Sequence, residues 1–456
     1  MKFGFVALLV GISILSLAQP PGRDNNFRIA LAGDSTIVRR MSVYDDPAYL
    51  QMIKRIRDAD VAFTNFEDLV HNYESAPAAA GGGFGTPSAG TYMQADPFVL
   101  DELKWAGFRL FSLANNHSYD YEAEGLLTSM QHFDRAGLVY AGVGENLARA
   151  RAPAYFDSPK GRVALIACAS SFPIHGPAGA QRGDVKGRPG VSPLRVKTIY
   201  TVDSATLASL RQVGGRGGGR GAQGDMNFLG ATFRAGDKPG VTTEADSKDV
   251  DGILAGVREA RRTADWVIVS IHAHNQAGNI DIPADFLRPF AHAAIDAGAD
   301  VFVGHGPHVL RGIEIYKGKP IFYSLGNFIM QDDLIKLQPQ EAYDNFNLPP
   351  SATPADFFDA RWNANSFGFR GNKKYWQSVI AEPVFNSKRE LQAINLYPIA
   401  LTYSETNPAG RGQPWPANAE EAREIIDRLA SLSKPLETKI TLQGDQGVVM
   451  LGSQAK

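Results

Sequence analysis

The chain has 456 residues, of which 44% are hydrophobic and 21% charged, so it is long enough to bury a sizeable core. Its 46 Lys and Arg against 48 Asp and Glu give a formal net charge of −2, which argues against a globally basic nucleic-acid-binding protein. A single cysteine excludes an intrachain disulfide and a cysteine-rich metal site.

The first eighteen residues have the pattern of a secretory signal peptide. Lys2 precedes an apolar run from Gly4 to Leu15, and the small residues Ser16 and Ala18 follow. We predict a signal peptide over 1–18, cleaved after Ala18, and a secreted or periplasmic mature protein. The run is shorter than the roughly 20 residues of a membrane-spanning helix. An uncleaved N-terminal membrane anchor is the alternative.

From Phe27 onward, short apolar runs alternate with amphipathic helical patterns. We expect strands at 27–32, 61–66, 108–114, 162–169, 266–271 and 301–303, a hairpin at 313–323, and strands at 378–385 and 391–399. Helices are expected at 47–57, at 97–105 after a cap at Asp96, and at 124–136, 249–263, 284–297 and 419–432. This alternation predicts an α/β fold in which helices cover a sheet.

Three stretches interrupt the alternation. Residues 76–90 are rich in Ala, Gly and Pro, residues 211–247 carry Gly-Gly-Arg repeats, and residues 331–375 are irregular. Because strands and helices resume after each stretch, we interpret all three as surface insertions. The chain is then one large domain, with a core over 27–330 and C-terminal strands and a helix over 376–456 that complete it.

Polar side chains follow five of the predicted strands directly. These are Asp34; Asn65 and Glu67; Asn115, Asn116 and His117; His272 and His274; and His305 and His308. Turn chemistry explains a single Asp or Asn after a strand, but it does not favour histidine. Since ligands bind at the C-terminal ends of strands in open α/β sheets, we predict one shared site.

This set of side chains suits divalent metal ions. Asp, Glu, Asn and His supply nitrogen and oxygen ligands of the kind that Mn, Fe or Zn ions take. Six ligands exceed the three that a catalytic zinc usually has, whereas two ions bridged by a carboxylate would use them all. Such a pair activates water and holds phosphoryl oxygens. A nearby histidine that is not a ligand could protonate the leaving group.

The motifs occur in a recognisable order. They are Gly33-Asp34, Asn65-Phe66-Glu67, Asn115-Asn116-His117 with Asp120, Gly304-His305-Gly306-Pro307-His308 and Tyr323-Ser324-Leu325-Gly326-Asn327-Phe328. This series resembles the CapA family of capsule and poly-γ-glutamate synthesis proteins (PgsA type), which is related to calcineurin-like metallophosphoesterases. The resemblance covers roughly 27–330 and implies a four-layer α-β-β-α sandwich of the metallophosphoesterase type, with the metal centre at the sheet edge.

The resemblance also implies roles for individual residues. Asp34 would bind the first of two divalent ions and Glu67 would bridge the pair. The remaining metal ligands would be Asn116, His272, His305 and His308. His117 would assist the leaving group, which makes His117 and Asp34 the expected catalytic residues. The expected substrate-binding residues are Arg39, with Arg40 competing for its role, and Asn65, Asn115 and His274. For His274 a loop position is favoured over a ligand role.

We therefore expect a secreted, metal-dependent hydrolase of surface-polymer biosynthesis that acts on a phosphoester or an anionic polymer, with membrane-bound synthesis proteins as partners. One alternative is a non-catalytic metal-containing component that binds or exports an anionic polymer, gripped by Arg211, Arg216 and Arg220. A minor alternative is a GDSL-type serine esterase with Ser35 as the nucleophile. That chemistry needs a distant Asp-x-x-His, whereas Asp68 and His71 form the only such pair.

Overall fold

The structure is a computed structural model. It describes residues 26–79, 91–214, 224–228, 230–363, 366, 368–403, 407 and 410–451. The predicted signal peptide, most of the 76–90 stretch, and Arg216 and Arg220 lie outside the described residues.

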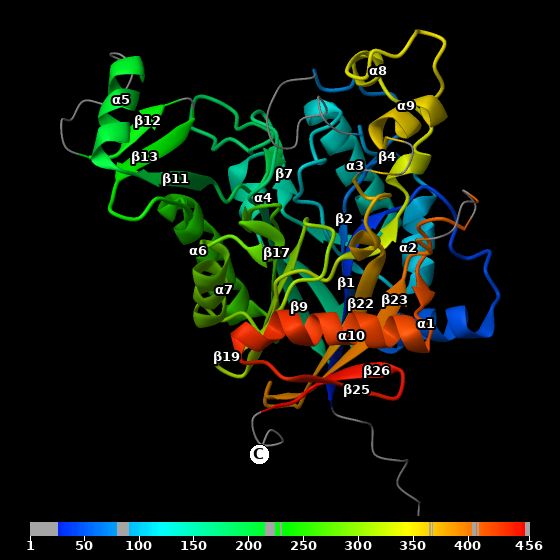
Figure 1. The fold of residues 1–456 in the computed structure, drawn as a ribbon. Helices are drawn as coiled ribbons and strands as arrows, with labels where there is room; N and C mark the ends of the chain where they lie inside the picture. Colours follow the sequence, from blue (N-terminus) through cyan, green and yellow to red (C-terminus); the bar gives the residue numbers. More distant parts are fainter. Residues whose placement is uncertain are drawn as a thin grey trace, which may run out of the picture.

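A ten-stranded sheet forms one half of the core (Figure 1). Its order is β25-β26-β23-β22-β1-β2-β5-β6, with β21 paired to β1 and β24 to β23. The central strands β1, β2, β5 and β6 are parallel, whereas β22 runs antiparallel to β1. The strands are β1 Phe27–Thr36, β2 Val61–Phe66, β5 Leu110–Ser112, β6 Val139–Ala141, β21 Asn327–Met330, β22 Gln377–Phe385, β23 Leu391–Ala400, β24 Trp415–Pro416, β25 Ile440–Gln443 and β26 Gln446–Val449.

A six-stranded sheet forms the other half, in the order β19-β20-β18-β15-β9-β8. Strands β9, β15, β18 and β20 run parallel to one another. At the two edges of this sheet, β19 pairs antiparallel with β20 and β8 pairs antiparallel with β9. The strands are β8 Ala154–Ser158, β9 Gly161–Ala169, β15 Trp266–His272, β18 Val301–His305, β19 Ile313–Tyr316 and β20 Lys319–Phe322.

The two sheets share one hydrophobic core. Ile29 and Phe63 of the first sheet belong to the same buried cluster as Leu165 and Ile268 of the second. The opposite faces of both sheets pack against helices, through residues that alternate with the inward ones. Helices α1 (Pro47–Asp58), α2 (Val99–Ala106) and α3 (Glu122–Ala136) cover the first sheet; α6 (Ser247–Thr263) and α7 (Leu287–Asp296) cover the second. The predicted mixed α/β fold is confirmed.

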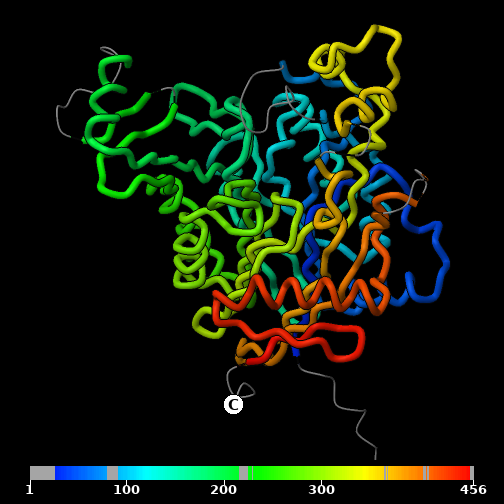
Figure 2. The backbone as a smooth tube through the Cα atoms, viewed as in Figure 1, coloured from blue at the N-terminus to red at the C-terminus, as the bar shows by residue number. Residues whose placement is uncertain are grey.

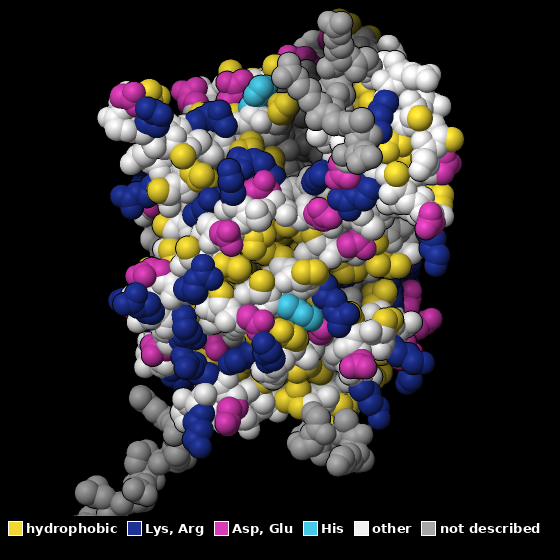
Figure 3. All heavy atoms as spheres, turned by 90° about the vertical axis from the view of Figure 1, so that its left-hand side faces the viewer, with side chains coloured by type: hydrophobic (Ala, Val, Ile, Leu, Met, Phe, Trp, Pro, Cys, Tyr) yellow, Lys and Arg dark blue, Asp and Glu magenta, His cyan; other side chains and the backbone are white. Residues whose placement is uncertain are grey.

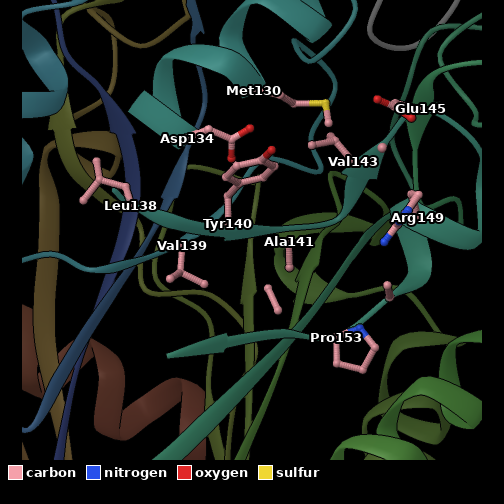
Figure 4. Close-up of a pocket in the computed structure, with 13 residues that line it drawn as sticks. Met130, Asp134, Leu138, Val139, Tyr140, Ala141, Val143, Glu145, Arg149 and Pro153 are labelled. Atoms are coloured by element: carbon pink, nitrogen blue, oxygen red, sulfur yellow. The ribbon is translucent and has the colours of Figure 1, made fainter. Parts of the chain in front are cut away.

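The space between the two sheets is covered by different elements on its two open sides. On one side, α10 (Ala419–Ser433) contributes Ile425 and Leu429 to the core beside β19 and β23. On the other side, β6 lies against β8 and β9, next to α4 (Leu147–Arg151) and the short pair β7 (Val143–Gly144) and β10 (Gly190–Val191). A surface hollow of about 530 Å³ lies here, with Tyr140 and Arg149 among its lining residues (Figure 4).

A small sheet with one helix stands apart from the core (Figures 1 and 2). Its strand order is β12-β13-β11-β14, and α5 packs on β12 and β13. The elements are β11 Val196–Val202, α5 Ser204–Gly214, β12 Met226–Phe228, β13 Ala231–Ala235 and β14 Gly240–Ala245. The described part of the 211–247 stretch is therefore mostly strand. Over this side of the molecule, Lys and Arg alternate with Asp and Glu (Figure 3).

The irregular stretch after residue 330 folds onto the first sheet's helices. It holds the 3-10 helices η3 (Asp332–Leu334) and η4 (Lys373–Trp376) and the helices α8 (Gln340–Asp344) and α9 (Pro354–Arg361). Phe357, Phe358 and Trp362 pack with Tyr92 and Tyr121 in one buried cluster. The short pairs β3 Leu69–Val70 with β4 Gln94–Ala95, and β16 Gln276–Ala277 with β17 Asn279–Pro283, complete the described strands.

The predicted helices and strands are observed, although β5 is shorter than the predicted 108–114 strand, and the strands β6, β8, β21, β25 and β26 were not predicted. The predicted cap at Asp96 is wrong, because α2 begins at Val99 with Phe98 at its N-cap and no capping side chain. The small sheet around β11 was not predicted. In the described part of the chain, no helix is both long and apolar enough to cross a membrane.

Candidate metal centre

Strand register brings the predicted site residues together in pairs. In the first sheet Asp34 of β1 lies opposite Asn65 of β2 and Asn327 of β21. In the second sheet His272 of β15 lies opposite His305 of β18. The pairs β1–β2 and β15–β18 are parallel, so within each sheet their C-terminal ends lie at one edge, and in the first sheet the start of β21 lies beside that edge. The shared core then sets the two edges side by side.

Asp34 contacts residues of both sheets. Its Oδ1 accepts a hydrogen bond from Asn65 Nδ2 (2.8 Å), and its Oδ2 accepts one from the amide of Gly306 (3.0 Å). The Nδ1 atom of His305 lies 3.5 Å from Oδ1, and the Nδ1 atom of His308 lies 3.5 Å from Oδ2. Asp34 is fully buried.

Glu67 lies beside two of the histidines of the site. Its Oε1 is 3.5 Å from His272 Nε2 and 3.6 Å from His308 Nε2. Both carboxylate oxygens are buried, and neither has a hydrogen-bond partner among the described residues. Burial of an ionised carboxylate without hydrogen bonds costs free energy, which a bound cation would offset.

His274 lies in the same group of side chains as Glu67 and His272, although a loop position was favoured for it. Its Nε2 lies 3.1 Å from His272 Nε2 and 3.2 Å from Asn116 Oδ1. The hydroxyl of Ser171 accepts a hydrogen bond from the His274 amide (2.9 Å), which holds the loop in place. The structure thus places His274 among the predicted ligands.

The spacing of these atoms suits metal ions. Ligand atoms about 2.1 Å from one shared ion lie roughly 3.0–3.4 Å apart. His272 Nδ1 and His305 Nδ1 are 3.0 Å apart, within that range, and three groups of side chains converge closely enough to hold an ion. The groups are Asp34, His272 and His305; Glu67, His272 and His274; and Asp34, Glu67 and His308. The donor set and the unpartnered Glu67 oxygens therefore fit divalent ions.

Two glycines make the close approach possible. A Cβ on Gly33, the residue before Asp34, would lie 1.9 Å from the carbonyl oxygen of Gly326. Gly306 has φ +110°, and a Cβ there would lie 3.1 Å from His272 Nε2. A side chain at either position would displace the ligands.

Burial controls the protonation of the cluster. Burial raises the pKa of Asp34 to about 7, against the lowering effect of hydrogen bonds from Gly306 and Asn65. Burial, together with the charge of Asp34, raises the pKa of Glu67 well above its usual value. Burial lowers the pKa of His305 to about 3 and that of His308 to about 4, so both imidazoles stay neutral at pH 7. Neutral imidazole is the form that binds metals.

His117 lies at the rim of the cluster and is held by a carboxylate. Its Nδ1 is 2.7 Å from Asp120 Oδ2, and its side chain is 20% exposed. Asp120 is buried and also accepts a hydrogen bond from the amide of Met93. Burial raises the pKa of Asp120, and the charge of His117 opposes that rise. This arrangement leaves Nε2 of His117 available to a substrate.

Three expected residues have other contacts. Arg39 is exposed, and its backbone amide donates to Gln331 Oε1 (3.0 Å). Arg40 Nη1 is paired with Glu102 (2.8 Å). Asn115 shapes the loop, because its Nδ2 donates to the carbonyl oxygen of Phe66 and its Oδ1 accepts from the His117 amide.

Ser35 does not have the contacts of a serine nucleophile. Its hydroxyl shares a hydrogen bond with Thr64 Oγ1 (2.7 Å), and in the described part of the chain no histidine is hydrogen-bonded to it. Of the Asp-x-x-His pair, Asp68 Oδ2 accepts from the Ile37 amide and His71 Nδ1 accepts from the Tyr73 amide. The structure gives the serine-esterase alternative no support.

Two residues that support the ligands were missed as site residues. Ser270 Oγ lies 2.6 Å from His305 Nε2, and Asn327 Oδ1 lies 2.8 Å from His308 Nδ1. Ser270 points inward two residues before His272, a spacing that strand alternation would have placed on the same face. Asn327 belongs to the Tyr323–Phe328 motif, which was used only for the family resemblance.

Comparisons with known proteins agree with the motifs. A family model described as "Bacterial capsule synthesis protein PGA_cap" matches residues 28–332. An uncharacterized protein of Sinorhizobium fredii, y4sH, is 36% identical over 441 residues, which cover 94% of each chain. The capsule biosynthesis protein CapA of Bacillus anthracis is 28% identical over 283 residues, which cover 60% of this chain and 51% of that protein. Among solved structures, a hypothetical protein from Thermus thermophilus aligns with 82% of this chain and 98% of its own, at 13% identity and a TM-score of 0.37.

Proposed function

Since the chain belongs to the bacterial capsule synthesis protein family, related to CapA, we propose that it is an extracytoplasmic, metal-dependent hydrolase of surface-polymer biosynthesis. Its substrate would be a phosphoester or an anionic polymer such as poly-γ-glutamate, and membrane-bound synthesis proteins would be its partners. The fold would be the four-layer α-β-β-α sandwich of metallophosphoesterases, with the two sheets as its inner layers.

Two divalent ions of the Mn, Fe or Zn type would occupy the cluster. Their ligands would be Asp34, Glu67, Asn116, His272, His305 and His308, with His274 as a further ligand. When bound, such ions supply activated water and neutralise the charge on substrate oxygens. The observation that carries this proposal is Glu67, which lies between His272 and His308 and whose two buried oxygens have no hydrogen-bond partner in the part of the chain that the structure describes.

The chain's own residues would provide the proton for the leaving group. An ionised Asp120 only accepts hydrogen bonds, so Nδ1–H of His117 donates to its Oδ2 at 2.7 Å, which fixes the ring. The opposite nitrogen, Nε2, belongs to a side chain that is 20% exposed. From there a protonated His117 can give a proton to the departing oxygen, while Asn65 keeps Asp34 oriented.

The test is hydrolysis of bis(p-nitrophenyl) phosphate in the presence of Mn²⁺. We expect His117→Asn to lower kcat by about 100-fold or more, because general acid catalysis typically contributes that much. Bound metal should not change, since His117 is not among the proposed ligands. His175→Asn, at an exposed histidine outside the cluster, is the matched control and should keep the wild-type rate.

The second candidate function is a non-catalytic component that holds an anionic polymer. A protein of Mycobacterium tuberculosis that is 43% identical over 96 residues, which cover 20% of this chain and 25% of that protein, is named a probable polyglutamine synthesis accessory protein. The word accessory in that name favours a role in polymer synthesis without catalysis. A wild-type protein that binds two ions, yet matches His117→Asn in every hydrolysis assay, would support this second function over the first.

A further inference from the structure

Asn327 is a buried polar residue beside the metal cluster, in hydrogen-bond contact with His308. It opens β21, lies opposite Asp34 in the strand register, and is fully buried. It is the asparagine of the Tyr323–Phe328 motif. Its side chain is hydrogen-bonded on both sides, so its orientation can be derived.

The neighbours of Asn327 determine which way its amide points. Nδ2 lies 2.9 Å from the carbonyl oxygen of Tyr375, 3.4 Å from that of His308 and 3.1 Å from Met330 Sδ. Carbonyl oxygens only accept hydrogen bonds, so the amide nitrogen must face them. A flipped amide would set two acceptors 2.9 Å apart. The carbonyl oxygen Oδ1 therefore faces His308 Nδ1 at 2.8 Å.

This orientation determines the tautomer of His308. Oδ1 of Asn327 can only accept, so Nδ1 of His308 must carry the proton. In a neutral imidazole the other nitrogen then has a free lone pair. That nitrogen, Nε2, is the atom that lies 3.6 Å from Glu67 Oε1.

We propose that Asn327 is the positioning residue that holds His308 as its Nδ1–H tautomer, so that Nε2 is the ligand atom this histidine presents to the metal cluster. The assignment of a ligand role to His308 rests on the proposed function; the tautomer itself does not. Ser270, beside His305, cannot do the same, because a hydroxyl can donate or accept.

The same amide ties His308 to the segment that covers it. Asn327 Nδ2 holds the Tyr375 carbonyl, and Trp376 Nε1 donates to the carbonyl of Phe369 (2.7 Å). The ring of Phe369 packs edge-on against His308, with ring centroids 4.9 Å apart. His308 also has φ +58°, a left-handed conformation that costs a residue with a side chain some strain. Asn327 thus fixes both the proton and the place of the ring.

The direct test is the protonation pattern of His308 in the metal-free protein at pH 8. Long-range ¹H–¹⁵N spectra of ¹⁵N-histidine-labelled protein separate the two tautomers, and the His308 signals are those missing from His308→Gln. We expect wild-type protein to show the Nδ1–H form. Asn327→Leu should lose it in favour of Nε2–H. A wild-type His308 in the Nε2–H form would overturn the proposal, even if Asn327→Leu fails to fold.

Zn²⁺ binding supplies a second readout. We expect Asn327→Leu to weaken one of two Zn²⁺ sites by roughly 10- to 100-fold in calorimetric titration, the usual effect of removing a partner of a metal-binding histidine. Asn395→Leu, at an asparagine that donates to Glu382 on another strand pair, is the control and should keep wild-type affinity. Unchanged Zn²⁺ affinity and tautomer in folded Asn327→Leu would refute the proposal. A protein that binds Zn²⁺ but hydrolyses nothing would refute the proposed hydrolase only.

Discussion

At the scale of single residues, burial determines what each histidine can do. His305 and His308 are buried among carboxylates that need a cation, and their lowered pKa values keep them as neutral ligands. His71 is equally buried but stands outside the three groups of candidate ligands. Its Nδ1 accepts from the Tyr73 amide, so it acts as a structural acceptor.

The burial of His71 leads to a predicted pH dependence of stability that does not involve the metal centre. Burial lowers its pKa from 6.5 to about 4, so between these values the unfolded chain binds a proton that the folded chain does not. Stability must therefore fall as pH drops from 6.5 towards 4. His71→Asn keeps an acceptor for Tyr73 without the titration, so it should lose less stability, by about 2 kcal/mol at pH 4.5.

The measurement is urea unfolding of both proteins, metal-free, at pH 7.5 and pH 4.5. The other titrating groups are common to both, so they cancel in the difference between the two variants. Parallel loss of stability in wild type and His71→Asn would mean that His71 is protonated in the folded protein.

Some residues of the site could be predicted from the sequence, and others could not. Asp34, Glu67 and the histidines after β15 and β18 could be named, because the ends of parallel strands share an edge. The structure of the loop that carries Arg39 could not be predicted, because its contacts with Gln331 and Glu102 come from residues distant in sequence. The contacts of His274 could not be predicted for a similar reason. Its ring reaches Asn116 of the other sheet, a contact that no local pattern predicts.

At the scale of elements, the approach of β1 to the turn before β21 positions Asp34. The amide of Asp34 donates to the carbonyl oxygen of Gly326 (2.9 Å), and Gly33 has no room for a Cβ beside that carbonyl. The sequence predicted β1 well from its apolar run. It could not predict β21 as its neighbour, because about 290 residues separate the two strands.

Gly33→Ala tests this approach. The added Cβ would lie 1.9 Å from a backbone oxygen that cannot rotate away, so β1 and β21 must separate. We expect a loss of unfolding free energy of more than about 2 kcal/mol, together with weakened metal binding, because Asp34 moves with the strand. Thermal unfolding and a Mn²⁺ titration measure the two effects.

Gly183→Ala is the matched control, because nothing lies within 4 Å of a Cβ at that position. It should be neutral in both measurements. If Gly33→Ala were as stable as Gly183→Ala and bound Mn²⁺ normally, the close packing of β1 on the Gly326 turn would not be what places Asp34.

At the scale of the whole molecule, the metal cluster is an interface between two sheets. Asp34, Glu67 and Asn116 come from the first sheet, and His272, His305 and His308 come from the second. The alternation of strands and helices predicted an α/β fold with helices on a sheet, and only the family resemblance implied a second sheet. The face-to-face packing that joins the two sheets depends on long-range contacts. The small β11 sheet was missed because its strands are short, polar and half-exposed.

The metal content of the protein after loading with Mn²⁺ and gel filtration shows whether the two-ion centre exists. We expect two ions per chain for the wild type and a clear loss in the double variant Asp34→Ala/His305→Ala, with His175→Asn unchanged. The bound ions should also raise the unfolding temperature, since they bind only the folded chain. A wild type that retains no Mn²⁺, Fe²⁺ or Zn²⁺, or a double variant that retains as much as the wild type, would contradict the two-ion centre.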